Sequence, residues 1–285
     1  MVDSEGLSNL GRPVDPNYPS NLFVILASVG SFLGFGLSSY FSGGSALGSL
    51  GFAAGSFLSV FLAWALAREL DPDYHLTAVL VVGGQVAAIV FNGVPSLLLP
   101  FWALFSFRVL NRTTGLKAGP LDNVLSLGLG VWLGYSLSWV VTAAGAVIFL
   151  ADGVMHRPKK TQFIPGVLAA AVSGYFFYRE PAVWGGFSDF PIKLAIVLLI
   201  SVLFSLVIYD SRKVSSTGDL TGEILSAARV QFTQLLALVV ALLIPLWNGV
   251  VGFHQSVTFW TVLGSAVIIH LLDLTGLKMD RLWSS

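Results

Sequence analysis

Long apolar stretches separated by short polar loops occupy almost the whole chain between Leu22 and Gly276. About 20 apolar residues in a helix cross the hydrocarbon core of a bilayer, and somewhat fewer suffice in a short span. Backbone polar groups must be paired in lipid, and continuous apolar runs without two-residue alternation select helices over a barrel. The pattern therefore predicts an all-α fold, a polytopic transmembrane helical bundle of nine to ten spans with several short helical hairpins.

Eight of the expected spans have clear boundaries. They are residues 22–41, 46–67, 76–91, 97–110, 163–178, 192–209, 230–251 and 257–274. The stretch 124–155 is ambiguous, because its roughly 30 residues can form one long tilted span or two short helices that turn near 135–139. No Gly or Pro marks such a turn.

The distribution of Lys and Arg favours two helices in this stretch. With one span, the fifteen basic residues divide seven to eight between the two sides of the membrane. With two spans, only Arg179 and Lys193 lie opposite the other thirteen, which matches the excess of positive charge in cytoplasmic loops. We therefore predict ten crossings of the cell membrane, with both termini cytoplasmic.

The pattern predicts no separate soluble domain. Residues 1–21 form a polar N-terminal segment, residues 22–276 a single transmembrane domain and residues 277–285 a short C-terminal tail. The N-terminal segment has no basic region before the first apolar run, so we expect that run to be a retained span and not a cleaved signal peptide. The second half of the longest internal loop, 210–229, is a candidate for a short surface helix.

Composition agrees with a membrane protein. The chain is 55% hydrophobic and 11% charged, with a mean hydropathy of +0.82, which leaves too little polar surface for a soluble protein of 285 residues. Fifteen basic and fifteen acidic residues cancel, which removes any argument for attraction to nucleic acid. The absence of cysteine excludes disulfides, thiolate metal sites and cysteine nucleophiles. Common hydrolase, zincin and nucleotide-binding motifs are also missing.

Two polar loops flank the first short hairpin and carry the main candidate site. The carboxylates near the end of the second span, Glu69, Asp71 and Asp73, are candidate ligands for a hard divalent cation such as Mg²⁺. The loop after the fourth span supplies cationic and hydroxyl groups that bind phosphate oxygens. Its candidate substrate-binding residues are Arg108, Arg112, Thr113, Thr114, Lys117 and Asp122. Together the loops predict a cytoplasmic site for a lipid-linked or phosphorylated substrate.

The same loops also have a purely structural interpretation. Charged residues gather at span ends because water begins there, and an acidic loop beside a basic one forms juxtamembrane salt bridges. Asp71 before Pro72 is also ordinary turn chemistry that ends a helix. On this interpretation the charges fix the hairpin and bind no ligand.

An ionisable pair lies near the end of the last span. His270 and Asp273 are three residues apart and share a helix face. Ionisable groups in an apolar helix are costly unless they are paired, so the two can mark a proton path or a ligand site. Alternatively, Asp273 reaches water at the cytoplasmic boundary with His270 as its hydrogen-bond partner. Asp152 has a similar place near the end of 124–155.

By size, number of spans and an acidic motif just after the second helix, the chain resembles the intramembrane prenyltransferases of the UbiA type. In that family, Asp-rich motifs after the second and sixth helices hold magnesium and an isoprenoid diphosphate. Asp71 and Asp73 are similar to part of the first motif, but its leading Asn-Asp and its Asp spacing are missing. Asp210 and Asp219, the candidates for the second motif, are nine residues apart, a wider spacing than the family's. The resemblance therefore extends to architecture and lacks a diagnostic motif.

Three functional hypotheses remain. The first is a membrane enzyme or lipid-binding protein whose two loops converge around a pocket at the cytoplasmic face. The second is a solute or ion transporter with a mid-membrane cavity lined by Gln85, Asn92 and Asn248. The third is a non-catalytic structural or assembly subunit with a dry, closed bundle and no polar pocket. The expected partners are the lipid bilayer and a lipid or phosphorylated small molecule, with no nucleic acid; catalytic residues, enzymatic status and protein partners stay open.

Overall fold

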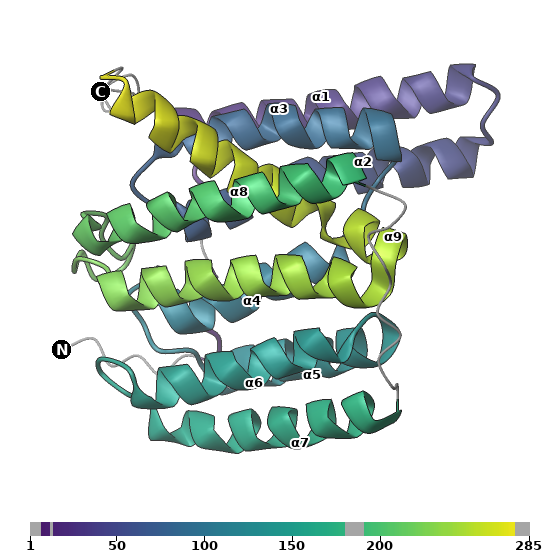
Figure 1. Ribbon diagram of the computed structural model, residues 1–285. Helices are drawn as coiled ribbons and strands as arrows, with labels where there is room; N and C mark the ends of the chain where they lie inside the picture. Colours follow the sequence, from purple (N-terminus) through teal and green to yellow (C-terminus); the bar gives the residue numbers. More distant parts are fainter. Residues whose placement is uncertain (1–6, 12–13, 180–190, 277–285) are drawn as a thin grey trace.

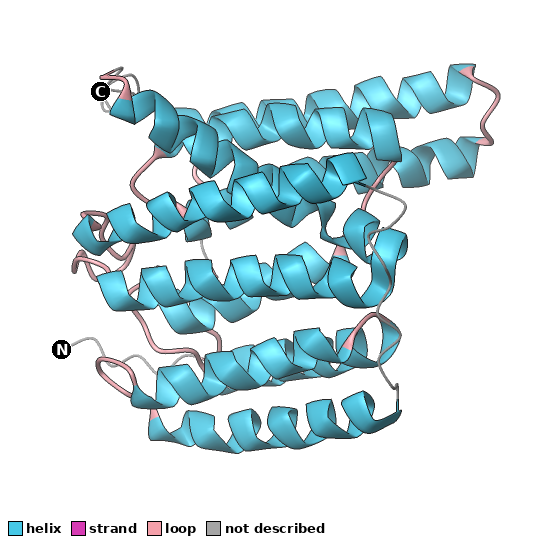
Figure 2. Cartoon of the chain, in the orientation of Figure 1, coloured by secondary structure: helices cyan, strands magenta, loops and turns pink. Residues whose placement is uncertain are grey.

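The chain folds into a bundle of helices joined mostly by short connections (Figures 1 and 2). The computed structural model describes residues 7–11, 14–179 and 191–276. The helices of this part of the chain are α1 (Pro19–Phe41), α2 (Ala46–Leu70), α3 (His75–Asn92), α4 (Leu98–Asn111), α5 (Pro120–Ser136), α6 (Trp139–Val154), α7 (Phe163–Arg179), α8 (Pro191–Asp210) and α9 (Ala227–Leu274). Two 3₁₀ turns, η1 (Lys160–Gln162) and η3 (Ser211–Lys213), precede α7 and follow α8. The prediction of an all-α fold is confirmed for the described residues.

Helix α9 consists of two arms. Its 48 residues would span about 72 Å if straight, at about 1.5 Å per residue, more than twice a hydrocarbon core of about 30 Å. Instead, Gly249 has φ 58° and ψ −135°, outside the helical region, and Pro245 removes a backbone donor one turn earlier. The chain therefore reverses direction between the arms 227–248 and 250–274, which Figure 1 shows as the yellow-green and yellow segments. These arms correspond to the last two predicted spans.

The ambiguous stretch 124–155 contains two helices, the alternative that the basic residues favour. Helix α5 ends at Ser136 and α6 begins at Trp139. The hydroxyl of Ser138 caps α6 by accepting from a backbone N–H two residues on, at 3.4 Å, so the turn needs neither Gly nor Pro. The two helices approach closely at Gly134, where a Cβ would lie 1.8 Å from the hydroxyl of Thr142.

Five helical segments are long and apolar enough to cross a membrane: α1, α2, α3, residues 194–213 and α9. The structure therefore supports a membrane-embedded protein, although five is fewer than the nine to ten crossings predicted. The difference arises because α4, α5, α6 and α7 have only 14, 17, 16 and 17 residues and because α9 is counted once despite its two arms. At about 1.5 Å per residue, such short helices reach roughly 21–26 Å, less than a hydrocarbon core of about 30 Å.

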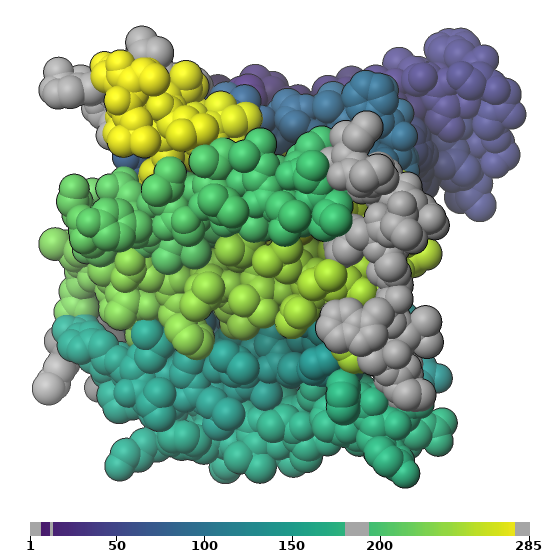
Figure 3. All heavy atoms as spheres, in the orientation of Figure 1, coloured from purple at the N-terminus to yellow at the C-terminus, as the bar shows by residue number. Residues whose placement is uncertain are grey.

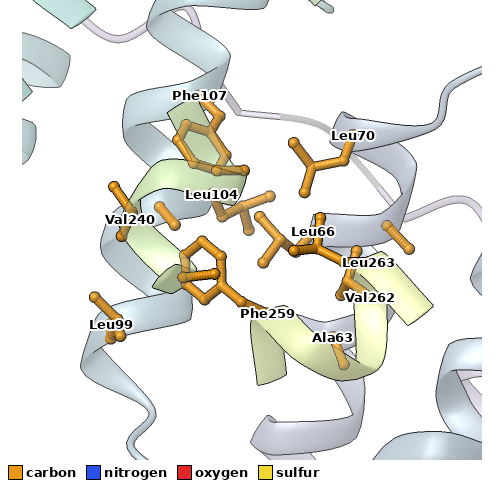
Figure 4. Close-up of a cluster of buried hydrophobic side chains, with 14 of the residues drawn as sticks. Ala63, Leu66, Leu70, Leu99, Leu104, Phe107, Val240, Phe259, Val262 and Leu263 are labelled. Carbon is orange, nitrogen blue, oxygen red and sulfur yellow. The ribbon is translucent and has the colours of Figure 1, made fainter. Parts of the chain in front are cut away.

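The core lies where α2, α4 and both arms of α9 meet (Figure 4). The labelled side chains come from α2 (Ala63, Leu66, Leu70), α4 (Leu99, Leu104, Phe107) and α9 (Val240, Phe259, Val262, Leu263). The rings of Phe107 and Phe259 pack edge to face, with centroids 6.3 Å apart and planes at 88°. Around this core, α8, the first arm of α9 and the α5 to α7 helices form adjoining layers on the face drawn in Figure 3.

The described connections lie at two opposite ends of the bundle (Figure 2). The loops 71–74, 112–119, 155–159 and 214–226 meet at one end, which we call the polar end. In place of the surface helix that was a candidate for the second half of 210–229, the structure has a turn in which Thr217 and Ile224 form an antiparallel bridge. Gly222, with φ 66°, allows the chain to reverse there.

Candidate functional site

Buried charged side chains gather at the polar end. Seven ionisable side chains are at most 8% exposed, although charged groups are rarely buried unless they are paired. They are Glu69, Asp71, Arg112, Asp122, Asp152, Arg229 and His270. Their partners divide them into four groups.

Glu69, at the end of α2, accepts hydrogen bonds from Arg108 at the end of α4 and from Thr113 in the loop 112–119, which we call the substrate loop. The Nε of Arg108 donates to Oε1 at 2.8 Å, and the hydroxyl of Thr113 donates to Oε2 at 2.9 Å. Arg108 also donates to the carbonyl oxygen of Leu10 at 3.1 Å. The acidic and basic loops therefore converge, and these three side chains satisfy one another.

The other candidate metal ligands have separate partners. The carboxylate of Asp73 accepts from the backbone N–H groups of Ser215 and Ser216 at 2.9 and 2.8 Å, whereas Asp71 faces α9. With Glu69 bound to the basic loop, the three carboxylates do not converge on one point. Within the described ranges, no group of three or more His, Asp or Glu residues is suited to a metal ion. This geometry gives the predicted Mg²⁺ site no support.

The 214–226 loop lies directly on the predicted substrate loop. Two of its backbone N–H groups donate to the carbonyl oxygens of Thr113 and Thr114, each at 3.1 Å. The contact is close, because a Cβ on Gly115 would lie 2.0 Å from a threonine hydroxyl of this loop. Thr114 is consequently buried, whereas Lys117 remains exposed.

Asp122 fastens the N-terminal segment to the start of α5. Its carboxylate accepts from the hydroxyl of Ser8 at 2.5 Å and from the backbone N–H groups of Asn9 and Gly119 at 2.9 and 2.7 Å. Bonds of this kind stabilise a helix N-terminus. They give Asp122 a capping role and leave it facing protein.

His270 and Asp273 lie in one cluster, but among the contacts of the described residues other partners take the place of the expected direct hydrogen bond between them. His270 contacts Asp71 and Asp210, and Asp273 contacts Tyr74. His270 lies 3.3 Å from Asp71 through Nε2 and 3.6 Å from Asp210 through Nδ1. Tyr74 packs on the imidazole with ring centroids 4.2 Å apart, and its hydroxyl lies 3.3 Å from carboxylate oxygens of both Asp210 and Asp273. The adjoining void of about 10 Å³ has room for about one water molecule. The cluster thus joins α8 and α9 to the α2–α3 connection and leaves no space for an organic substrate.

Asp152, near the end of α6, accepts from two arginines. Arg112 donates to Oδ1 through Nε at 3.0 Å and through Nη2 at 2.6 Å. Arg229 donates to the same oxygen through Nη1 at 2.6 Å. All three side chains are at most 9% exposed. Two guanidinium groups thus share one carboxylate, and this buried cluster carries a net charge of +1.

Backbone carbonyl groups hold both arginines in place. Arg112 donates to the carbonyl oxygen of Arg157 at 2.7 Å. Arg229 donates to those of Leu110 and His156 at 2.7 and 2.8 Å. The orientation of the two guanidinium groups is therefore fixed by protein contacts alone.

A cavity of about 380 Å³ opens beside these arginines. Its volume lies within the range of about 300–1,000 Å³ that is usual for small-molecule sites. Besides Arg112 and Arg229, the residues that line it include Asn111, His156, Arg157, Glu223, Ile224 and Ser226. Ser226 immediately precedes α9, so the positive N-terminal end of that helix also faces the cavity. We call this cavity the arginine pocket.

Backbone strain marks the same place. Arg112 and Arg157 both have φ 55°, and they are the two non-glycine residues with positive φ in the part of the chain that the structure describes. The left-handed conformation costs a residue with a Cβ roughly 1–2 kcal/mol. Such strain tends to cluster at functional sites, where surrounding contacts maintain it.

The floor of the arginine pocket is formed by the buried Arg112 and Arg229, and its rim by the exposed Arg157 and Glu223. The two parts differ in their electrostatics. Burial lowers the pKa of the Arg112 guanidinium, an effect that the neighbouring Asp152 carboxylate opposes. At the rim, Arg157 and Glu223 form an ion pair whose side chains are 58% and 53% exposed. Their hydrogen bond lowers the pKa of Glu223 and raises that of Arg157. The floor therefore holds buried, shared charge, and the rim holds a solvated pair.

The sequence pattern does not single out Arg157, Glu223 or Arg229 as site residues. In the sequence, Arg157 and Arg229 contribute only to the uneven distribution of basic residues between the two sides of the membrane. One signal was available, because Arg229 and Asp152 lie at the ends of apolar runs, and ionisable residues in such segments usually face the bundle interior. Which acid meets which base depends on how α4, α6 and α9 pack.

The polar residues proposed for a transport cavity lie in different surroundings. Gln85 donates to the hydroxyl of Ser59 at 2.7 Å and accepts from that of Thr261 at 2.8 Å, so it links α3 to α2 and α9. Asn92 donates to a carbonyl of its own helix, and Asn248 donates to a carbonyl in the α5–α6 turn at 2.5 Å. The three share no partner, which is typical of interhelical and local hydrogen bonds.

Comparisons of the chain with protein-family models, with curated proteins and with solved structures give no match. The resemblance to UbiA-type prenyltransferases therefore receives no support from these comparisons. The two candidates for the second Asp-rich motif also have different roles in the fold. Asp210 contacts Tyr74 at the end of α8, whereas the backbone of Asp219 donates to Thr113 from the 214–226 loop.

Proposed function

We propose that this chain is a polytopic integral membrane protein that binds a phosphorylated or lipid-linked anion in the arginine pocket. The observation that carries the proposal is the sharing of one buried carboxylate, Asp152, by Arg112 and Arg229 beside a cavity of about 380 Å³. An excess of buried positive charge is costly unless an anion offsets it. A bound anion would supply that charge.

The chemistry of the pocket suits a phosphoryl group. Guanidinium groups bind phosphate oxygens through paired N–H donors, and a helix N-terminus favours negative charge. Arg112 and Arg229 are already oriented by backbone carbonyls, so binding would require little reordering of these side chains. The proposal concerns binding and assigns no reaction.

We further propose ten crossings of the cell membrane, with the polar end and both termini in the cytoplasm. The described connections alternate between the two ends of the bundle, and α1 to α8 with the two arms of α9 make ten helical segments. Thirteen of the fifteen basic residues would then lie on the cytoplasmic side, with Arg179 and Lys193 opposite. Short helices are accommodated by local thinning of the bilayer or by flanking polar residues.

The other two hypotheses have less support. A transporter with a shared mid-membrane cavity would bring Gln85, Asn92 and Asn248 together, and these residues have separate partners. A dry structural subunit would lack a polar pocket, and the arginine pocket at the polar end argues against it.

Calorimetric titration of the purified protein in an uncharged detergent tests the binding proposal. We expect dihexanoyl phosphatidylglycerol to bind and dihexanoylglycerol, which lacks the phosphate, not to bind. Arg112→Lys and Arg229→Lys keep the charge but lose the paired donors, so each is expected to weaken binding about tenfold. Arg212→Gln is the matched control, because Arg212 packs on Tyr209 outside the pocket. Equal binding of both probes, or unchanged affinity in both Lys variants, would refute the proposal.

Introduced cysteines test the topology, since the natural chain has none. Thr217→Cys lies at the polar end and Ser42→Cys in the α1–α2 turn at the opposite end. In intact cells, an impermeant maleimide is expected to label position 42 and to label position 217 only after permeabilisation. Labelling of both positions from the same side would contradict the proposed arrangement.

A further inference from the structure

Arg157 connects the floor of the arginine pocket to its rim. Its carbonyl oxygen accepts from Nη1 of Arg112 at 2.7 Å, so its backbone belongs to the floor. Its side chain pairs with Glu223 at the rim, where both side chains are more than half exposed, at 58% and 53%. A ligand that enters the pocket therefore meets an arginine that already has a carboxylate partner.

The position of Glu223 is fixed by the turn in the 214–226 loop. Its carbonyl oxygen accepts from the backbone N–H of Gly218 at 2.8 Å, and the adjacent Ile224 forms the antiparallel bridge to Thr217. The same loop is bonded to the substrate loop through its backbone. The backbone of Glu223 is thus held in place by hydrogen bonds, and the residue forms part of the pocket wall.

The charges around the cavity sum to a small positive value. Arg112, Arg157 and Arg229 contribute three positive charges, and Asp152 and Glu223 contribute two negative charges. With His156 counted as neutral, the balance is three minus two, or +1. One negative charge on a ligand would complete the balance and leave every ion pair intact.

We propose that Glu223 makes the arginine pocket selective for a singly charged phosphodiester over a doubly charged phosphate monoester. This inference rests on the proposed function and names the class of its ligand. A phosphodiester carries one negative charge, whereas a monoester carries about 1.5 to 2 near neutral pH. The second charge would lie beside the Glu223 carboxylate, and like charges repel each other at a solvated protein surface, more strongly at low salt.

The phosphodiester can come from a lipid or from a soluble molecule. The phosphate that links headgroup to glycerol in a membrane phospholipid is a diester, and Ile224, which is 69% exposed, offers an apolar contact at the cavity wall. A soluble glycerophosphodiester presents the same phosphate without acyl chains. The experiment separates these sources by using both.

Titration calorimetry at about pH 8 compares three probes in an uncharged detergent. Dihexanoyl phosphatidylglycerol is the diester, dihexanoyl phosphatidic acid is the monoester with the same chains, and glycerophosphoglycerol is the diester without chains. The proteins are the natural chain, Glu223→Gln and the control Asp219→Asn, which removes a carboxylate from the same loop but outside the cavity lining. Thermal unfolding confirms that each variant is folded.

We expect the natural chain to bind the acylated diester more tightly than the monoester, by roughly threefold to fivefold at low salt. Glu223→Gln is expected to abolish or reverse this preference by tightening monoester binding, and Asp219→Asn is expected to retain it. Tight binding of glycerophosphoglycerol would identify a soluble ligand. Binding of the acylated diester without binding of glycerophosphoglycerol would identify a lipid. Either result supports the proposal when the monoester binds more weakly than the diester. Equal affinities in the natural chain, or an equal effect of both variants, would overturn the role of Glu223 while leaving anion binding intact. Absence of binding by all probes would overturn this inference and the proposed function together.

Discussion

The substitution Asp152→Asn tests the centre of the arginine pocket. Asp152 is fully buried, and one of its oxygens accepts three hydrogen bonds from Arg112 and Arg229, at 2.6 to 3.0 Å. Asparagine has nearly the same shape and keeps one carbonyl oxygen, so the change removes the negative charge and little volume. Two buried guanidinium groups would then have no countercharge.

The size of the effect follows from the burial of this cluster. Removing one member of a buried ion pair costs about 3–5 kcal/mol, because the remaining charge stays in a poorly solvated place. The cavity gives the arginines some access to water and the amide oxygen still accepts, so we expect the lower end, about 3 kcal/mol. This corresponds to roughly a hundredfold decrease in the folding equilibrium constant, at about 1.4 kcal/mol for each factor of ten.

Unfolding by SDS in mixed micelles, followed by circular dichroism, measures this loss. The control is Glu223→Gln, which breaks an exposed ion pair and is expected to leave the midpoint almost unchanged. Since Asp152→Asn raises the charge of the pocket from +1 to +2, dihexanoyl phosphatidylglycerol should stabilise this variant more than the natural chain. A loss of stability below about 1 kcal/mol would show that Asp152 does not hold two charged arginines in a buried site.

Other variants test the surrounding structure. Thr113→Val removes a donor to the buried carboxylate of Glu69 and is expected to cost about 1–2 kcal/mol in SDS unfolding; a neutral result would contradict that hydrogen bond. Gly115→Ala places a methyl group 2.0 Å from a hydroxyl of the 214–226 loop, at a position whose φ of +85° already disfavours alanine. The loop is expected to detach, so endoproteinase Glu-C should cleave after Glu223 faster than in the natural chain. An unchanged cleavage rate would refute the docking of this loop. Gln85→Leu removes hydrogen bonds between α3, α2 and α9 and is expected to cost about 1 kcal/mol, as measured by the same SDS titration, whereas a stabilised variant would contradict the assigned role. The arginine partner of Glu223 lowers the pKa of Glu223 below its ordinary 4.5, so their contact is complete above that value and is lost as pH falls through the lowered pKa. Hydrogen exchange in the loop, corrected for intrinsic rates, should therefore stay constant from about pH 8 down to the ordinary 4.5 and rise only below it. A rise at about pH 6 would contradict this contact.

The fold class was predictable because lipid restricts what a backbone can do. Apolar runs set the approximate position of each helix, and the distribution of basic residues favoured two helices in 124–155, where α5 and α6 now lie. The exact positions of the turns between helices were harder to predict from the sequence. Ser138 caps α6 without any Gly or Pro signal, and the break in α9 falls at Gly249, whose backbone conformation no periodicity encodes.

The arginine pocket was predictable only in part. Arg112 stood out as a phosphate-binding candidate, but its counterion Asp152 is 40 residues away, and Arg229 is a further 77 residues along the chain. Only helix packing brings them together. The acidic motif was misleading. The spacing of Asp71 and Asp73 suggested that they chelate a metal ion, but in the fold a hydroxyl group donates to Asp71 and backbone N–H groups donate to Asp73.

The first described residues of the chain act as a strap across the polar end. Leu7, Ser8, Asn9 and Leu10 are bonded to α4 and to the start of α5, on either side of the loop that presents Arg112. Its partners Arg108 and Asp122 are synthesised 98 to 114 residues later, so this segment can dock only after that part of the chain has been made. Proteolytic trimming after position 10 would therefore loosen this loop from a distance and leave every described helix uncut.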